Sequence, residues 1–417
     1  MNLLRTLRRL FPARPARRPQ ARPRVRPLLE ALEDRAVPTA YTWVGPAGGA
    51  WGAGANWENA LTHTVGQVPG PTDDALFGAP GADTSCLVNG SFAADRVVMG
   101  GDYDQTLTVP AGSSLAAATL FQQSGTLALS GGSVSSGNDF FVNGAVTASG
   151  GSTSRLAAGA GLFLRGGPIT VAGMTMPGVP LLALSGAVED AADITVGSPA
   201  TGMPGSVQVT GSLTVDPNAV ITLNSATGLT FVAGTPASVF DVQGTIVLYQ
   251  ATVTTNVPLD LDGGTLLTAA AANADRINGS VRNEGAITWA GAALHPLTIS
   301  GDYTQGASGG AAGALNLRVG GGSSDRLSVG GEASLAGTLS VSDQGSMSPS
   351  LWTLLSAAAI SGDFDAVDLP AGWHDDLNPD SVTVQYEAAI SGDFDTVGLP
   401  AGWHYPVNPA SVTVQNI

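Results

Sequence analysis

The 417-residue sequence has no lysine, a single cysteine and few charged residues. Only 12% of the residues are charged, against a usual share of roughly 25%. The lone Cys86 excludes an intrachain disulfide and any metal site built from several cysteines. The sequence also lacks zinc-ligand spacing, a phosphate-binding loop, a Gly-x-Ser-x-Gly nucleophile turn and a dinucleotide fingerprint. We therefore predict that the chain is not an enzyme and carries no cofactor.

Charge is distributed unevenly along the chain. Residues 1–40 contain ten arginines and three acidic residues, a net charge of +7, whereas residues 41–417 carry a net charge of −23. An acidic body repels nucleic acid phosphates and anionic lipid headgroups. We therefore expect no nucleic acid partner. We also expect neither a transmembrane segment nor a membrane barrel, because alternating lipid-facing strands would need far more chain.

Glycine is abundant, with 56 residues, and short apolar stretches alternate with polar residues. Val207, Val209, Leu213 and Val215 alternate in this way across Gly211, and similar short fragments recur along the chain. Period-two alternation is typical of β-strands with one buried face. Several β-sandwiches or one β-solenoid could use such strands. The absence of domain linkers favours an all-β fold, a parallel β-helix or β-solenoid of about 12–15 coils.

The pattern divides the chain into four regions. We expect a disordered, Arg/Pro-rich leader at 1–40, a Trp-rich N-terminal cap at 41–77, the solenoid at 78–345 and a short β C-terminal cap at 346–417. The C-terminal cap contains a tandem repeat, because residues 357–385 and 387–415 are identical at 22 of 29 positions. We expect two strands in each copy.

The end of the leader carries a recognisable motif. Residues 26–38 read RPLLEALEDRAVP. This stretch resembles the LExLEDRxxP segment of large extracellular proteins of planctomycete bacteria, in which an Arg-rich leader precedes the motif and repetitive β domains follow. The resemblance implies export and an extracellular or cell-surface location.

A second resemblance lies near the end of the predicted solenoid. Residues 299–339 contain, in order, ISGDYTQ, GALNL, SDRLSVGG and LAGTL. This order is similar to the closing coils of autotransporter-like β-helix passenger domains. We therefore expect a structural or adhesive role, with cell-envelope polysaccharides or surface proteins as partners. The alternative is a carbohydrate-binding or polysaccharide-degrading β-helix protein, a lyase or hydrolase.

Three tryptophans in the N-terminal cap, Trp43, Trp51 and Trp57, have two interpretations. Indole faces pack well on sugar rings, which makes them candidates for glycan stacking. Large aromatic side chains also cover the apolar, unpaired end of a solenoid. We favour the second interpretation, and keep the three residues as candidate ligand-binding residues.

Two aspartates are candidates for a metal site. Asp260 and Asp262 lie in an Asp-x-Asp-Gly sequence, a fragment of a calcium-binding loop. The distal glutamate and the other ligands of such a loop are missing. The expectation is weak calcium binding at most, with aspartates in solvated turns as the alternative.

Overall fold

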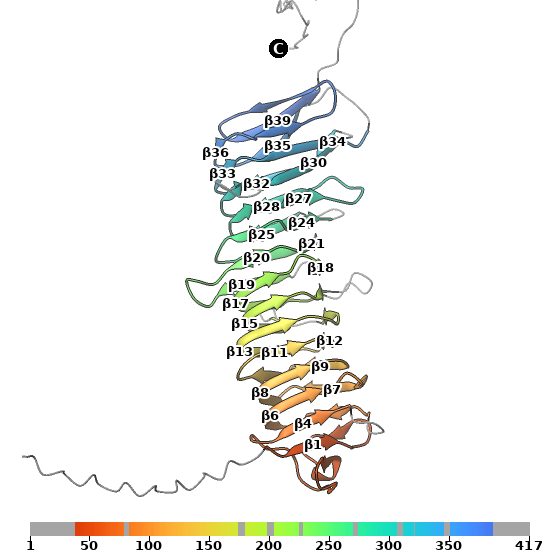
Figure 1. Ribbon diagram of the computed structural model, residues 1–417. Coiled ribbons are helices and arrows are strands. Elements are labelled where there is room, and N and C mark those ends of the chain that lie inside the picture. Colours follow the sequence, from red (N-terminus) through yellow and green to blue (C-terminus); the bar gives the residue numbers. More distant parts are fainter. Residues whose placement is uncertain are drawn as a thin grey trace, which may run out of the picture. The chain divides into compact units, whose positions relative to one another are not determined.

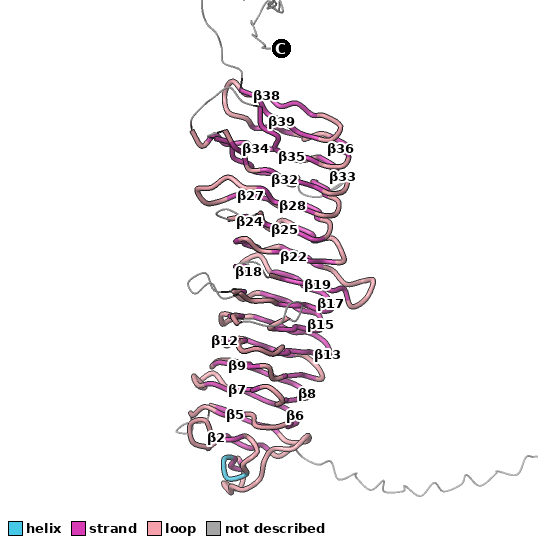
Figure 2. The backbone as a smooth tube through the Cα atoms, turned by 180° about the vertical axis from the view of Figure 1, so that it is seen from behind, coloured by secondary structure: helices cyan, strands magenta, loops and turns pink. Residues whose placement is uncertain are grey.

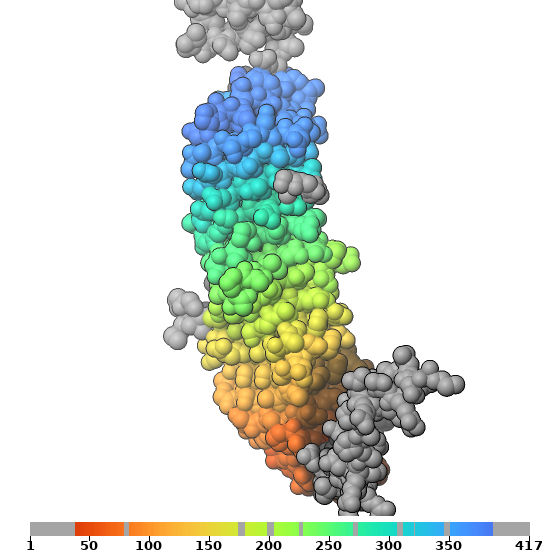
Figure 3. Space-filling model, turned by 60° about the vertical axis from the view of Figure 1, so that its left-hand side comes forward, coloured from red at the N-terminus to blue at the C-terminus, as the bar shows by residue number. Residues whose placement is uncertain are grey.

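The computed structural model describes residues 38–78, 83–173, 180–197, 204–224, 228–269, 274–306, 312–320, 322–345 and 351–386. The leader motif at 26–38, apart from Pro38, and the second repeat copy lie outside these residues. The described residues between Pro38 and Tyr386 wind into a column of stacked parallel coils, which confirms the predicted all-β solenoid (Figure 1). Figure 3 shows the sequence colours changing steadily along this column, as expected when each coil contacts mainly the coils next to it.

Each complete coil contributes three short strands, which lie on three faces of the column. Faces 1 and 2 belong to one 24-stranded sheet, and face 3 is a 15-stranded sheet. Five long strands bend from face 1 into face 2: β6 (Ser91–Met99), β8 (Ser114–Gln122), β13 (Ser154–Leu164), β15 (Leu182–Asp190) and β17 (Val207–Val215).

The separate strands of each face stack in chain order (Figure 2). Face 1 contains β10 (Ser133–Ser136), β19 (Leu229–Ala233), β22 (Thr252–Thr255), β25 (Asp275–Asn278), β28 (Pro296–Ile299), β32 (Arg326–Val329) and β35 (Leu351–Ser356). Face 2 contains β4 (Asp74–Phe77), β11 (Phe140–Val142), β20 (Phe240–Val242), β23 (Leu259–Leu261), β26 (Val281–Asn283), β29 (Tyr303–Gln305), β33 (Glu332–Leu335) and β36 (Ala359–Gly362). Face 3 contains β2 (Gly49–Ala50), β5 (Cys86–Leu87), β7 (Thr106–Pro110), β9 (Thr126–Ser130), β12 (Ala145–Ala148), β14 (Ile169–Val171), β16 (Asp193–Val196), β18 (Val220–Asn224), β21 (Thr245–Tyr249), β24 (Thr265–Thr268), β27 (Ala286–Trp289), β30 (Ala314–Gly320) with its short partner β31 (Ser323–Ser324), β34 (Thr338–Asp343) and β37 (Ala366–Asp368).

Twelve coils, from β6–β7 to β35–β37, have strands on all three faces, at the lower end of the predicted 12–15. Coil length varies along the column. The coil from Ser114 to Ser133 has 19 residues, whereas the coil from Thr298 to Ser328 has 30. Turns between strands absorb the extra residues, so the pairing register survives.

A ladder of aliphatic side chains fills the interior behind face 3. Eleven consecutive coils place Ile, Leu or Val at the same inward position: Leu107, Leu127, Val146, Ile169, Ile194, Ile221, Ile246, Leu266, Ile287, Leu315 and Leu339. All eleven are buried. Burying such a side chain stabilises the fold by about 1.5–3 kcal/mol relative to leaving it exposed. Because each of these side chains is covered by those of the adjacent coils, the stability of each coil depends on its neighbours.

The bend between faces 1 and 2 requires glycine in two stacked coils. Gly186 and Gly211 pair with each other in β15 and β17, with φ of 118° and 125°. A Cβ atom on Gly211 would lie 2.2 Å from the carbonyl oxygen of Gly186. Only glycine accepts both this backbone conformation and this close approach.

The N-terminal end is closed by a local departure from parallel pairing. Strand β1 (Ala40–Trp43) pairs in parallel with β4 but antiparallel with β3 (Trp57–Asn59). A single 3-10 turn, Gly54–Asn56, leads into β3 and is the only helical turn in the described residues. No helix in this part of the chain is long and apolar enough to cross a membrane.

The first repeat copy closes the other end and has four strands rather than the predicted two. Strands β36 and β37 continue the parallel stacking onto β33 and β34. Strands β38 (Trp373–Leu377) and β39 (Ser381–Tyr386) then form an antiparallel hairpin, and β39 pairs antiparallel with β35. Parallel pairing thus runs from β1 to β37 and extends beyond the predicted limits, 78 and 345, on both sides.

One interior column, at the end of the face 2 strands, contains polar residues. Three side-chain amides in this column donate hydrogen bonds of 2.9–3.1 Å to backbone carbonyl oxygens; they belong to Gln122, Asn283 and Gln305. Asp190 occupies the same kind of position in β15 and is fully buried. Its Oδ1 accepts a 3.3 Å hydrogen bond from the backbone N–H of Ala192, while its Oδ2 has no partner among the described residues. Burial raises the pKa of Asp190 to about 8.

This buried aspartate should make stability depend on pH. Between about pH 4 and pH 8 the unfolded chain releases the Asp190 proton and the folded chain retains it. The free energy of unfolding then falls by up to about 1.4 kcal/mol per pH unit as the pH rises, and the effect levels off above pH 8. Asp190→Asn should remove this slope and stabilise the protein at pH 8. Denaturant unfolding at pH 5, 6.5 and 8 measures the free energy of unfolding at each pH. Asp193→Asn, at an exposed position, is the control. An unchanged slope in Asp190→Asn would contradict the prediction.

Candidate binding face

Face 2 carries a column of aromatic and charged side chains on its outer surface. Eight successive coils are in register here, and we call their outward residues the outer strip: Phe121, Phe141, Phe163, Glu189, Thr214, Asp241, Asp260 and Arg282. Neighbouring strands lie about 4.8 Å apart, so the strip presents one side chain per coil at that spacing. Such a surface is linear and repetitive.

The first three positions of the strip form a ladder of phenyl rings. The centroids of Phe121 and Phe141 are 5.0 Å apart, and those of Phe141 and Phe163 are 4.9 Å apart. The rings are almost parallel, with interplanar angles of 2° and 11°. Their faces cover one another and their edges reach the surface, because all three side chains are only partly buried. A ligand would therefore meet ring edges rather than open ring faces.

A cation covers the last ring of this ladder. The guanidinium carbon of Arg165 lies 4.9 Å from the ring centroid of Phe163. The same guanidinium forms a 2.6 Å ion pair with Glu189, the next residue of the strip. The aromatic half of the strip thus joins the charged half through Arg165.

The charged half brings two carboxylates together. Asp241 and Asp260 are paired on adjacent parallel strands and both face outward. Burial raises the pKa of both carboxyl groups, and the negative charge of Asp262 raises them further. Arg282 lies 3.3 Å from Asp260 and opposes this rise in the pKa of Asp260. The arrangement offers hydrogen-bond acceptors and one cation to a hydroxyl-rich or basic ligand.

Face 3 is different on its outer surface. Four stacked threonines, Thr147, Thr170, Thr195 and Thr222, occupy the corresponding outward column. None carries a charge or an aromatic ring. The contrast shows that the strip is a property of face 2 and does not follow from stacking alone.

The predicted calcium ligands lie at the charged half of the strip. Asp260 faces outward from β23 and Asp262 follows directly, exposed at the corner of the coil. Asp260 is already paired with Arg282. The described residues contain no group of three or more His, Cys, Asp or Glu side chains placed to hold a metal ion. Two aspartates beside an arginine fit a tightly bound calcium poorly, and weak binding stays a prediction.

The three candidate tryptophans lie inside the N-terminal cap. Trp43, Trp51 and Trp57 are fully buried, and their rings pack edge to face with centroids 4.7 and 5.2 Å apart. The indole N–H of Trp57 donates a 2.8 Å hydrogen bond to the backbone oxygen of Trp51. No ring face is open to a sugar, so the stacking hypothesis is wrong for this conformation. The geometry fits the interpretation as a cap.

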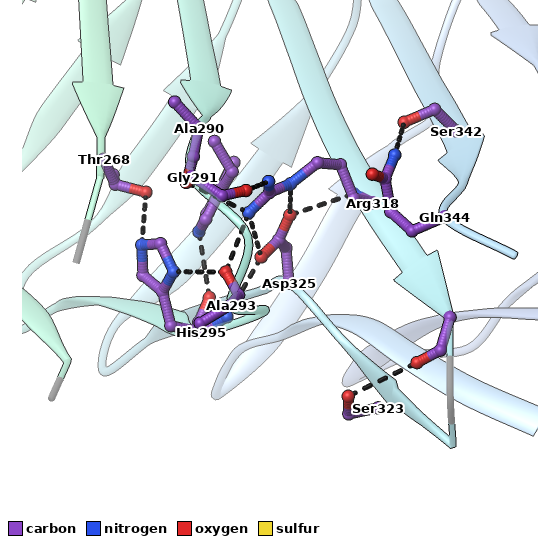
Figure 4. A network of polar contacts seen from close by, with 12 residues as sticks. Thr268, Ala290, Gly291, Ala293, His295, Arg318, Ser323, Asp325, Ser342 and Gln344 are labelled. Carbon is purple, nitrogen blue, oxygen red and sulfur yellow. Dashed lines mark hydrogen bonds and ion pairs between the residues drawn. The ribbon is translucent and has the colours of Figure 1, made fainter. Parts of the chain in front are cut away.

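A buried polar network lies between β27 and β28 (Figure 4). Both oxygens of Asp325 contact the guanidinium of Arg318, with Nε at 2.6 Å and an NH2 group at 3.2 Å. Asp325 also accepts a 3.0 Å hydrogen bond from the backbone N–H of His295. Arg318 in turn donates to the carbonyl oxygens of Ala290 and Ala293. The ion pair therefore fixes the loop that precedes β28.

The histidine of this network has contacts that superficially suggest catalysis. Nε2 of His295 lies 3.0 Å from the hydroxyl of Thr268 and 3.8 Å from a carboxylate oxygen of Asp275. All three side chains are buried, and His295 is 2% exposed. Both partners contact the same ring nitrogen, so Asp275 cannot orient the ring from the opposite side as in a catalytic triad. The network is structural.

This network leads to a stability prediction. Asp325→Ala should lower the free energy of unfolding by about 3–5 kcal/mol, because it leaves Arg318 buried without its partner. Asp260→Ala removes an ion pair of the same type at the surface and should cost at most about 1 kcal/mol. Denaturant unfolding of the two variants compares them directly. Equal losses would show that the Arg318–Asp325 pair is no more important than a surface pair.

Comparisons of the chain with known protein families, with curated proteins and with solved structures found no match in any of the three.

Proposed function

We propose that the protein is a non-enzymatic β-solenoid of the cell surface or extracellular space, with a structural role and an adhesive one through the outer strip. The observation that carries this proposal is the strip itself. Seven of its eight positions, one per coil, are aromatic or charged, whereas the corresponding outward column of face 3 has no aromatic or charged residue in the same coils. A repeating linear site suits a linear polymer better than a compact small molecule.

The charge of the protein narrows the choice of partner. Residues 41–417 carry a net charge of −23, and the strip contributes three carboxylates against one arginine of its own. Acidic polymers would be repelled. A neutral cell-envelope polysaccharide, whose hydroxyl groups can donate to Asp241 and Asp260, is the partner we propose; a surface protein is the alternative. Export rests on the resemblance of residues 26–38 to planctomycete extracellular proteins.

The adhesive role can be tested with the full chain and immobilised neutral polysaccharides. Asp241→Ala combined with Arg282→Ala should weaken binding at least about tenfold, because both removed groups face the ligand from the strip. Thr195→Ala combined with Thr222→Ala, on face 3 of nearby coils, is the matched control and should bind like the parent. Binding that is equal in both double variants, or missing in the parent, would remove the adhesive role.

One observation favours a second candidate, a polysaccharide hydrolase or lyase. Asp241 and Asp260 are paired on adjacent strands, and burial raises the pKa of both. Neighbouring strands are about 4.8 Å apart, which allows the two carboxyl groups to lie close together. Retaining glycosidases use two carboxyl groups separated by about 5–5.5 Å, one of them with a raised pKa.

This candidate predicts release of reducing or unsaturated sugar ends from a panel of polysaccharides. Asp241→Asn or Asp260→Asn should abolish the release, while Asp262→Asn should retain most of it. Loss of activity in Asp262→Asn as well would reject Asp241 and Asp260 as the specific catalytic pair. No product from any polysaccharide would reject the enzyme and leave the binding role.

A further inference from the structure

The tandem repeat contains two nearly identical copies, one of which caps one end of the solenoid. The first copy, residues 357–385, forms that end (Figure 1). Residues 387–415 repeat it with 22 of 29 identical positions. The question is whether the second copy retains the residues with which the first copy docks.

The first copy docks through a small set of side chains, three of which are buried. Phe364, Val382 and Val384 are buried in the core of the column. A carboxylate oxygen of Asp365 accepts a 2.7 Å hydrogen bond from the backbone N–H of Gly337. The ring of Trp373 stacks on Trp352 of β35, with centroids 4.8 Å apart and an interplanar angle of 18°.

The second copy has the same residue at every one of these docking positions. The counterparts are Phe394, Asp395, Trp403, Val412 and Val414. The first copy differs from the second at seven positions: Ala357, Ala366, Asp368, Asp375, Asp376, Leu377 and Asp380. None of these seven residues is buried. The differences thus leave the docking side chains unchanged; Ala366 and Asp368 pair with β34 through their backbone.

The hairpin β38–β39 also determines where the described chain ends relative to the last coil. Strand β39 runs antiparallel to β35, so Gln385 lies opposite Leu351 at the start of β35. In the solenoid, the chain instead enters face 2 from the end of a face 1 strand, as it does between Ser356 and Ala359. The chain therefore leaves the first cap at the wrong corner for a further face 2 strand.

Chain connectivity decides which copy holds the end. The first copy follows β35 after a two-residue link, Ala357–Ala358. For the second copy to take the same place, about 30 further residues must close as a loop, which disfavours it on the order of 100-fold at equal docking strength. We propose that residues 387–415 are an interchangeable cap, which docks on β35 of its own chain when residues 357–385 are detached.

A disulfide trap tests this exchange in the full chain. Directly opposed residues of antiparallel strands have Cβ atoms about 4.5–5.5 Å apart, close enough for a disulfide after a small adjustment. Leu351→Cys with Gln385→Cys reports the first cap, and Leu351→Cys with Gln415→Cys reports the second. Cys86 does not interfere, because it is buried and burial raises the pKa of its thiol.

The first trap should close in the parent chain and the second should stay largely open. Phe364→Asp, which detaches the first cap, should reverse this. Adding Phe394→Asp to Phe364→Asp should then prevent the second disulfide. Asp380→Ala, a control at a position where the two copies differ, should leave the formation of both disulfides as in the parent chain. If the second trap stays open in Phe364→Asp, or closes only between two chains, the intrachain exchange is wrong.

Thermal unfolding provides an independent measurement. Deleting residues 357–386 joins Ser356 to Glu387 and places the second copy where the first copy was. This variant should melt within a few degrees of the parent, as should a variant lacking residues 387–417. Removing all residues from 357 onward should lower the midpoint strongly. If deleting residues 357–386 is as damaging as removing both copies, the second copy is not a cap.

Discussion

Parallel pairing between successive coils is the constraint on which the rest of this structure depends. A single coil has three short strands and cannot bury its own apolar residues. Stacking places Leu107 and its counterparts up to Leu339 above one another, so that each aliphatic side chain is covered by those of its neighbours. Insertions in the turns are tolerated as long as the strands stay in register, as coils of 19 and 30 residues demonstrate.

The same register also determines the outer surface. A side chain that points outward from one coil lies about 4.8 Å from its counterpart on the next. On face 2 this brings three phenyl rings into a stack and sets Asp241 beside Asp260. A solenoid therefore brings residues that are 19 to 27 positions apart in the sequence into one continuous surface, and the function we propose uses that surface.

Stacking creates a problem at both ends, and the two ends solve it differently. At the N-terminus, Trp43, Trp51 and Trp57 fill the space below the first coil. At the C-terminus, the β38–β39 hairpin reverses the chain and covers β35. Both devices place antiparallel pairing and large aromatic residues where parallel stacking stops. Unpaired strand edges and apolar surface are covered in the same step.

The amino-acid sequence by itself determined the strands, the solenoid and the acidic body, because period-two alternation, glycine-rich turns and net charge are local or additive properties. It also identified the tandem repeat, and it allowed both interpretations of the tryptophans, between which burial decided. Only the tertiary structure decided the outer strip and the partners of Asp190, His295 and Asp325. Irregular coil lengths leave no fixed spacing between Phe121, Phe141, Phe163 and Glu189, so no periodic signal marks them. Their alignment follows from backbone pairing between coils, which exists only in the folded chain.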